Sequence, residues 1–309
     1  MKRHKLTLEE KEQVIKLYTT TDLLQKDIAE KLKISAASVC NILKSNNISI
    51  KSLIKCDETF FETINSIERA WVSGFILADG CLHGNDSYTI RIALTSKDFE
   101  VLEKIKKYMK LDHSIKKVST LHKTTNKIYN SIELNIARKK LWEDLVKLGI
   151  GPNKSKELTL PDIPKHLMRD FIRGIHCGDG GFYIDRDNRL NWTLACPVLS
   201  FLEEIQQLLF EECNLEKKTI GSTPNKKCYR LVYGGNNVVR KIFNYLYPNP
   251  ENKVFLERKY NYAKNHFDNL EKGIKSRNEK EAALNQYEFS KEPEPEPRSQ
   301  LDILLGINK

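Results

Sequence analysis

The chain has 309 residues, of which 40% are hydrophobic, so it can bury a core in one large domain or in two to three small ones. Its formal net charge of +10 favours a polyanionic partner, most commonly nucleic acid, although a basic surface can also serve solubility alone. No apolar run reaches the length of a membrane span, and the N-terminus carries no apolar signal core. We therefore expect an intracellular protein, cytoplasmic or nucleoid-associated, with no membrane partner.

Seven cysteines are scattered along the chain, and no two of them have the C-x-x-C spacing of a structural zinc site. An odd and dispersed set is typical of reduced, mostly buried thiols in a reducing compartment. The cysteines therefore indicate neither a zinc module nor a disulfide framework.

Residues 1–50 are predicted to form three short helices, at residues 7–18, 25–32 and 36–45. Ser35 stands directly before the third helix, where a serine side chain can cap the first turn. This pattern resembles the helix-turn-helix family, in which an alanine of the second helix, here Ala29, packs under the third. The family usually has glycine at the turn, where a positive φ is needed, and this chain has Lys33 instead.

The resemblance implies that residues 1–50 bind DNA through the exposed side of the third helix. The side chains that we expect to make this contact are Ser35, Ser38, Asn41 and Lys44. The alternative interpretation is a small three-helix bundle that binds nothing.

Two similar segments follow a connector at residues 51–67. The first segment spans residues 68–150, a linker rich in Gly, Pro and Lys spans residues 151–163, and the second segment spans residues 164–268. Each is predicted to have the order helix, strand, strand, helix, strand, strand, helix. Such a duplication predicts one domain with pseudo-two-fold symmetry, because two similar halves can bury a shared interface.

In the two segments, alternation of apolar and polar residues indicates the strands, and apolar residues at helical spacing indicate the helices. In the first segment we predict strands at residues 88–94, 114–120 and 129–137, and helices at residues 98–109 and 139–148. In the second we predict strands at residues 190–196 and 226–233 and a closing helix at residues 237–247. Leu102 and Ile105 have apolar counterparts, Leu202 and Ile205, exactly 100 residues later.

The strongest signal is a pair of short runs at the same spacing of 100 residues, Gly74 to Gly80 and Gly174 to Gly180. In each run a glycine is followed four residues later by a small residue, Ala78 or Gly178, and then by Asp-Gly. Small residues one helical turn apart allow two helices to approach closely.

The paired helix ends would bring Asp79 and Asp179 together. Two neighbouring carboxylates repel each other, so one must take a proton or a cation must lie between them. Oxygen ligands beside a phosphate partner favour Mg²⁺ over zinc or copper, and such an ion can activate water for phosphodiester cleavage.

This arrangement resembles the LAGLIDADG homing endonucleases over roughly residues 66–268, and two motifs in one chain resemble the family's monomeric type. The resemblance implies an α+β fold with two pseudo-symmetric αββαββα halves, which form a saddle for double-stranded DNA. It also implies Mg²⁺-dependent double-strand cleavage, with Mn²⁺ as a possible substitute. Asp79 and Asp179 would each serve one strand, and the carbonyl groups of Ala78 and Gly178 would assist in metal binding.

The strands of such a saddle present alternate side chains to the major groove. The basic residues on or near them that we expect to contact DNA are Arg91, Lys116, Lys117, Lys127, Lys217, Lys226, Lys227 and Arg230. The resemblance further implies a lysine near the scissile phosphates, which the sequence does not single out. Leu77 and Cys177 stand where the family usually has an earlier aspartate; this position is not a metal ligand, so the departure bears on packing.

Two other functions are compatible with the pattern. A transcription regulator could use the same scaffold to bind DNA without cutting it, and the helix-turn-helix segment makes this reading credible. An intron maturase would bind folded RNA instead. An intein is not expected, because splicing-junction residues are missing at both ends.

Residues 269–309 are predicted to be a charged tail. Alternating Glu and Pro at residues 292–297 predict a stiff, extended spacer. The segment after it resembles the short peptides that dock on bacterial sliding clamps, with the motif residues Gln300, Leu301, Ile303 and Leu305. The alternative is a frayed terminus without a partner.

Overall fold

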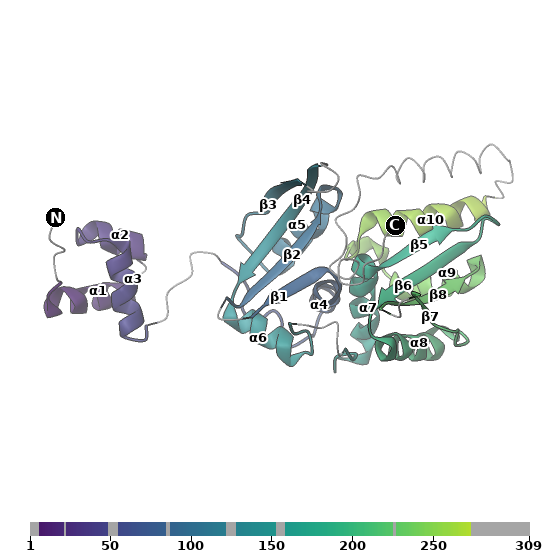
Figure 1. Ribbon diagram of the computed structural model, residues 1–309, viewed down its shortest axis with the longest axis horizontal. Helices are drawn as coiled ribbons and strands as arrows, with labels where there is room; N and C mark the ends of the chain where they lie inside the picture. Colours follow the sequence, from purple (N-terminus) through teal and green to yellow (C-terminus); the bar gives the residue numbers. More distant parts are fainter. Residues whose placement is uncertain are drawn as a thin grey trace. The chain divides into compact units, whose positions relative to one another are not determined.

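The computed structural model describes residues 6–21, 23–48, 55–84, 87–121, 128–152, 158–224 and 227–272. The chain divides into two compact units, residues 1–55 and residues 56–309 (Figure 1). Each unit has its own cluster of buried hydrophobic side chains.

The first unit contains three helices, α1 (Leu8–Thr20), α2 (Gln25–Lys31) and α3 (Ala36–Ser45). Thr7 and Glu10 form a capping box at the start of α1, and the hydroxyl of Ser35 accepts a hydrogen bond from the Ser38 amide, as predicted for the cap of α3. The buried cluster draws on all three helices and includes Val14, Ile28 and Leu43. Lys33, in the turn between α2 and α3, has a φ of 53°, which is the left-handed conformation that usually calls for glycine.

The second unit begins with the predicted order of elements. They are α4 (Ile67–Asp79), β1 (Gly80–His83), β2 (Thr89–Thr95), α5 (Phe99–Tyr108), β3 (Lys116–Leu121), β4 (Ile128–Ala137) and α6 (Lys139–Lys147), with a short 3₁₀ turn at Ser96–Asp98. The four strands form an antiparallel sheet in the order β1-β2-β4-β3.

The same order then repeats. The second half contains α7 (Lys165–Asp179), β5 (Gly180–Ile184), β6 (Leu190–Cys196), α8 (Leu199–Cys213), β7 (Gly221–Ser222), β8 (Tyr229–Gly234) and α9 (Asn236–Leu246). Its sheet has the equivalent antiparallel order β5-β6-β8-β7. A 3₁₀ turn (Pro250–Asn252) leads to an additional helix, α10 (Glu257–Glu271), which is not among the elements predicted above.

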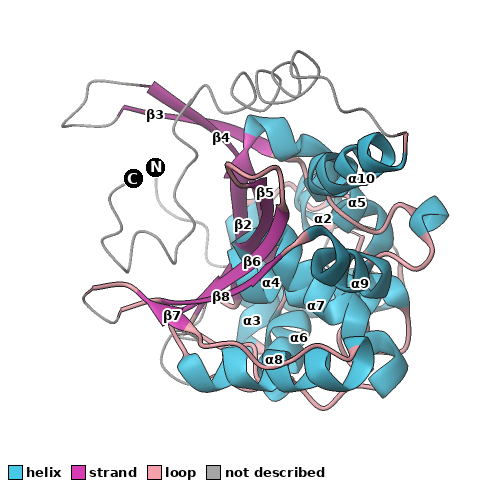
Figure 2. Ribbon diagram, turned by 90° about the vertical axis from the view of Figure 1, so that its right-hand side faces the viewer, coloured by secondary structure: helices cyan, strands magenta, loops and turns pink. Residues whose placement is uncertain are grey.

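One face of each sheet is buried and the other is open. In β2 and β4 the buried positions alternate, as Ile90, Ile92 and Leu94 in β2 and Ile132, Leu134 and Ile136 in β4. In Figure 2 the strands of both sheets lie on one side of the second unit and its helices on the other. The predicted α+β class and the duplicated αββαββα architecture are therefore confirmed.

Candidate active site and nucleic-acid surface

The centre of the second unit is the contact between α4 and α7, which lie side by side between the two sheets (Figure 1). Glycine permits this approach at two equivalent positions. A Cβ atom at Gly74 would lie 2.0 Å from the carbonyl oxygen of Phe171, and one at Gly174 would lie 2.2 Å from that of Trp71. The two helix backbones therefore touch where the sequence repeats its first glycine.

The last turns of α4 and α7 bring the two Asp-Gly ends into one place. A Cβ atom at Gly178 would lie 2.4 Å from the Cβ of Ala78 and 2.9 Å from Oδ2 of Asp79. The carboxylate of Asp79 thus lies against the residue that precedes Asp179. Asp79 and Asp179 are both partly exposed, whereas the residues of α4 directly before Asp79 are buried.

Lys259 on α10 closes the end of α7, and sequence reasoning did not find it. Its ammonium group lies within hydrogen-bonding distance of four backbone carbonyl oxygens, those of His176 (3.1 Å), Cys177 (2.7 Å), Gly178 (3.0 Å) and Gly180 (2.6 Å), so at least one of its three N–H donors is shared. These carbonyls include terminal acceptors that lack partners inside a helix, so a cation there satisfies both hydrogen bonding and the helix dipole. Burial lowers the pKa of the Lys259 ammonium, the Arg258 charge lowers it further, and the nearby negative charge of Asp79 opposes both effects.

The residues just before Gly178 serve packing. His176 is fully buried, with its ring stacked on Trp192 at 5.8 Å between centroids and edge-on to Phe182 at 4.8 Å. Burial lowers the pKa of His176 to about 3, so its ring is neutral at physiological pH. Cys177 is also buried, and its sulfur accepts a hydrogen bond from the Leu256 amide at 3.4 Å.

The donors at the two helix ends suit a hard divalent cation. Asp79, Asp179 and the carbonyl of Ala78 offer oxygen atoms only, which Mg²⁺ prefers. The Gly178 carbonyl, a predicted ligand, already accepts a hydrogen bond from Lys259. Across the described ranges no cluster of three or more His, Cys, Asp or Glu side chains could hold a metal. Mg²⁺ commonly uses one or two carboxylates and completes its shell with water and phosphate oxygens, so the donor set fits this ion.

Two of the predicted DNA-binding residues lie on the open face of the first sheet. Arg91 on β2 and Lys116 on β3 are both in register with β4, Arg91 opposite Asn135 and Lys116 opposite Glu133. The guanidinium Nη2 of Arg91 forms an ion pair with Oε1 of Glu133. The hydrogen bond from Arg91 is the main reason why the pKa of Glu133 is lowered, despite partial burial.

The other predicted residues are distributed more widely. Lys117 is opposite the buried Ile132, so it belongs to the helix-covered side of the first sheet, although it is exposed at the sheet edge. Arg230 is exposed on β8, Lys217 lies in the segment before β7, and Lys227 lies just before β8. Residues Lys127, Lys226, Gln300, Leu301, Ile303 and Leu305 lie outside the described residues.

In the first unit, α3 presents three of its predicted contact residues to solvent. Ser35, Asn41 and Lys44 are exposed, whereas Ser38 is half-buried and its hydroxyl lies 2.8 Å from that of Ser35. Ala29 is buried in the same hydrophobic cluster as Val39 of α3, which fits an alanine that packs under the third helix.

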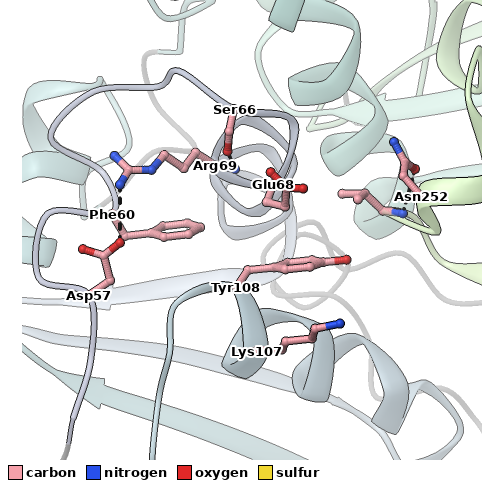
Figure 3. A pocket seen from close by; sticks show the side chains of 9 residues that line it. Asp57, Phe60, Ser66, Glu68, Arg69, Lys107, Tyr108 and Asn252 are labelled. Carbon is pink, nitrogen blue, oxygen red and sulfur yellow. Dashed lines mark hydrogen bonds and ion pairs between the residues drawn. The ribbon is translucent and has the colours of Figure 1, made fainter.

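A pocket of about 450 Å³ lies at the other end of α4 (Figure 3). Ser66, Glu68 and Arg69 line it from the start of α4, Tyr108 from α5, and Asn252 from the second half. The 13 residues of α4 separate this pocket from Asp79 by about 20 Å at 1.5 Å per residue. Its Asp57–Arg69 ion pair, at 3.3 Å, ties the segment before α4 to the helix.

Comparison with known proteins gives one family match. Residues 66–148 match the family model described as the LAGLIDADG-like domain. A search of curated proteins gave no match. Within the described residues, no helix is both long and apolar enough to cross a membrane.

The chain is also similar to several solved structures. These include the I-LtrWI LAGLIDADG homing endonuclease bound to target DNA, at 13% identity, covering 71% of this chain and 96% of that chain, with a TM-score of 0.46. The homing endonuclease I-WcaI bound to its DNA recognition sequence is 15% identical; the match covers 66% of this chain and 91% of that chain, with a TM-score of 0.49. The N-terminal LAGLIDADG domain of DUF199/WhiA is 13% identical; the match covers 64% of this chain and 92% of that chain, with a TM-score of 0.39.

The class defined by the fold is a duplicated α+β domain whose two central helices end side by side in Asp-Gly. The match to the LAGLIDADG-like domain covers the first half of this unit, residues 66–148, and the second half repeats the same order of elements.

Proposed function

We propose that the chain is a site-specific DNA endonuclease that makes Mg²⁺-dependent double-strand breaks at a long target. One observation carries this proposal. The equivalent ends of α4 and α7 meet so closely that the carboxylate of Asp79 lies against Gly178, next to Asp179. Two carboxylates from two equivalent helix ends suit a reaction that must be performed twice, once on each DNA strand.

In this proposal Asp79 and Asp179 would each hold a divalent ion, one for each DNA strand, and the Ala78 carbonyl would be a further oxygen donor. When bound, Mg²⁺ would supply a more acidic water and stabilise charge on the leaving 3′ oxygen. The protein contributes the fixed position of the carboxylates, because the glycines of the helix contact set the separation of the two helix ends. Lys259 holds the last carbonyls of α7 and so orients the backbone that carries Asp179.

The open faces of the two sheets would bind the duplex. Arg91, Lys116 and Arg230 support this role because they lie on the faces not covered by helices. The net charge of +10 supports a large electrostatic contribution to affinity. Binding should therefore weaken steeply as salt rises, since each phosphate contact releases counterions.

The first unit would add a second DNA contact through α3, where Ser35, Asn41 and Lys44 are exposed. Its hydrophobic core is separate from that of the second unit, so the two can be tested apart. Removing residues 1–55 should reduce affinity for DNA more than it moves the position of the cut. Docking of the C-terminal segment on a sliding clamp stays a prediction from the sequence.

The direct test is incubation of the full chain with a randomised plasmid library and Mg²⁺, followed by sequencing of the ends produced. Cleavage at one long recurring site, abolished by chelation of the metal, is the expected result. A chain that selects a DNA sequence but cuts no member of the library would instead be a non-cleaving regulator on this scaffold. Preference for a folded intron RNA over duplex DNA would favour the maturase alternative.

A further inference from the structure

The two halves present different side chains at equivalent positions of their open faces, beside the two aspartates. The equivalence follows from strand register, since Gly80 pairs with Ile92 and Gly180 pairs with Leu194. Arg91, which pairs with Cys81, therefore corresponds to Thr193, which pairs with Gly181.

The next open-face row of each sheet differs as well. In the first half it reads Ala93, Glu133, Lys116 across β2, β4 and β3. In the second half it reads Ala195, Arg230, Gly221 across β6, β8 and β7. An acidic residue of one half thus occupies the position of an arginine in the other.

The first half joins two of these positions by an ion pair between Arg91 and Glu133. The Arg91 side chain is 40% exposed, whereas that of Glu133 is 12% exposed. Glu133 contacts Nη2 of Arg91 and lies opposite Lys116 in the register. A guanidinium group held at one nitrogen by a carboxylate loses freedom of rotation, while its other donors remain available for a bidentate contact.

Guanine is the base that such an arginine recognises, because its O6 and N7 acceptors match two guanidinium donors in the major groove. The second half has Thr193 at the position of Arg91. Its own open-face arginine, Arg230, lies on the neighbouring strand β8, in the row that corresponds to Ala93 and Glu133 of the first half. Adjacent rows are two residues apart along a strand, or about 6.6 Å, so Arg91 and Arg230 lie at different distances from Asp79 and Asp179 respectively.

We propose that Arg91, oriented by Glu133, reads guanine in the half-site next to Asp79, and that Arg230 reads a base at a non-equivalent position of the other half-site. This inference rests on the proposed function, since it assumes that the open faces bind duplex DNA. It makes the recognised sequence asymmetric at positions close to the cut. Glu133 acts here as a positioning residue and does not contact the base.

The test is selection of bound sequences from a randomised duplex library by the full chain, without divalent metal so that binding is measured apart from cutting. The Arg91→Gln variant should reduce the preference for guanine roughly 10-fold at a single position, the loss of one bidentate contact. Glu133→Gln should weaken the preference at that same position by a smaller factor. Arg230→Gln should change one position on the opposite side of the centre.

The control is Lys147→Gln, because Lys147 is an exposed lysine of α6, among the helices that lie on the other side of the unit from the strands. It should leave every base preference unchanged. If Arg91→Gln lowers affinity equally for all sequences, Arg91 is a phosphate contact and the inference is overturned, while the proposed function stands. If the unaltered chain selects no sequence, the proposed function fails and the inference fails with it.

Discussion

The carboxylate of Asp79 and the backbone of Gly178 are in contact, and there is no room for a side chain between them. A methyl group at residue 178 would lie 2.9 Å from Asp79 Oδ2 and 2.4 Å from the Cβ of Ala78. The second half therefore needs glycine where the first half has alanine. The two copies differ at this position because only one of two facing residues can carry a Cβ.

Gly178→Ala should displace Asp79 or push the two helix ends apart. We expect a loss of cleavage together with a destabilisation of about 1–3 kcal/mol, as is usual for overpacking. The control is Gly181→Ala, three residues later, where the nearest atom to an added Cβ is Thr193 Cγ2 at 3.9 Å. Plasmid cleavage and urea unfolding would be measured for both variants; equal behaviour would contradict the close contact.

Asp79→Asn and Asp179→Asn should each stop the cutting of one strand. The amide keeps the shape of the carboxylate but loses its charge, so we expect the affected strand to be cut at least about 100-fold more slowly, a loss of several kcal/mol in metal-assisted charge stabilisation. The readout is the ratio of nicked to linear product from a supercoiled plasmid that carries the selected target. Asp112→Asn, at an exposed position after α5, is the control. Linearisation by Asp79→Asn at the unaltered rate would remove that residue from the proposed mechanism.

Local patterns in the sequence predicted most of the second unit, because each pattern is a direct consequence of which face is buried. The strand Leu190–Cys196 was predicted with its exact bounds, and the helix at Lys139–Lys147 to within one residue. Helix α10 was missed although Tyr260, Ala263 and Phe267 have helical spacing. The role of Lys259 could not have been predicted, since a lysine is usually exposed and its four acceptors are distant in sequence.

The sequence also did not show which strand residues of the two halves are equivalent. The helix ends repeat after 100 residues, but the equivalent strand residues Ile92 and Leu194 are 102 residues apart. The second hairpin is longer by two residues, so a fixed offset gives the wrong equivalents. Strand pairing was needed to show that Arg91 corresponds to Thr193.

Lys259→Met should destabilise the second unit by roughly 2–4 kcal/mol, because several carbonyls at the end of α7 would lose a charged donor. Lys264→Met, on the same helix, removes a lysine whose side chain is 45% exposed and paired with Asp268. That exposed pair should contribute little to stability, because solvent screens it. All three tryptophans lie in the second unit, so their fluorescence during urea unfolding reports on this unit alone. Equal losses in the two variants would argue against a special role for Lys259.

Stability should fall as the pH drops below about 6.5. His176 has a pKa of about 3 in the folded chain, against 6.5 ordinarily, so between these values the unfolded state binds the extra proton. Above pH 6.5 the His176 ring is neutral in both states and costs no stability. By pH 5 its protonation in the unfolded state alone lowers the free energy of unfolding by about 2 kcal/mol. Burial also lowers the pKa of His113 and His266, which adds to the same slope.

The variant that isolates this effect is His176→Gln, which is polar but does not titrate. It should lower stability at pH 7 through lost packing against Trp192, yet flatten the slope between pH 6.5 and pH 5. His166→Gln, at an exposed position of α7, is the control. An unchanged slope in His176→Gln would mean that the ring is already protonated, or is not buried, in the native chain.

Lys33→Gly should stabilise the first unit, because Lys33 has a φ of 53° in the turn between α2 and α3. A non-glycine residue in the left-handed region costs about 1–2 kcal/mol, and glycine removes this strain. The added entropy of glycine in the unfolded chain offsets roughly 0.4–1 kcal/mol of that gain, so we expect a net gain of about 0.5–1 kcal/mol. Lys33→Ala is the matched control: it removes the same charge but keeps a Cβ, so it should give no gain. Hydrogen exchange of the α2 and α3 amides in the full chain measures the change in this unit directly. Slower exchange in both variants would assign the effect to the lost charge, and unchanged exchange in Lys33→Gly would show that the turn is unstrained.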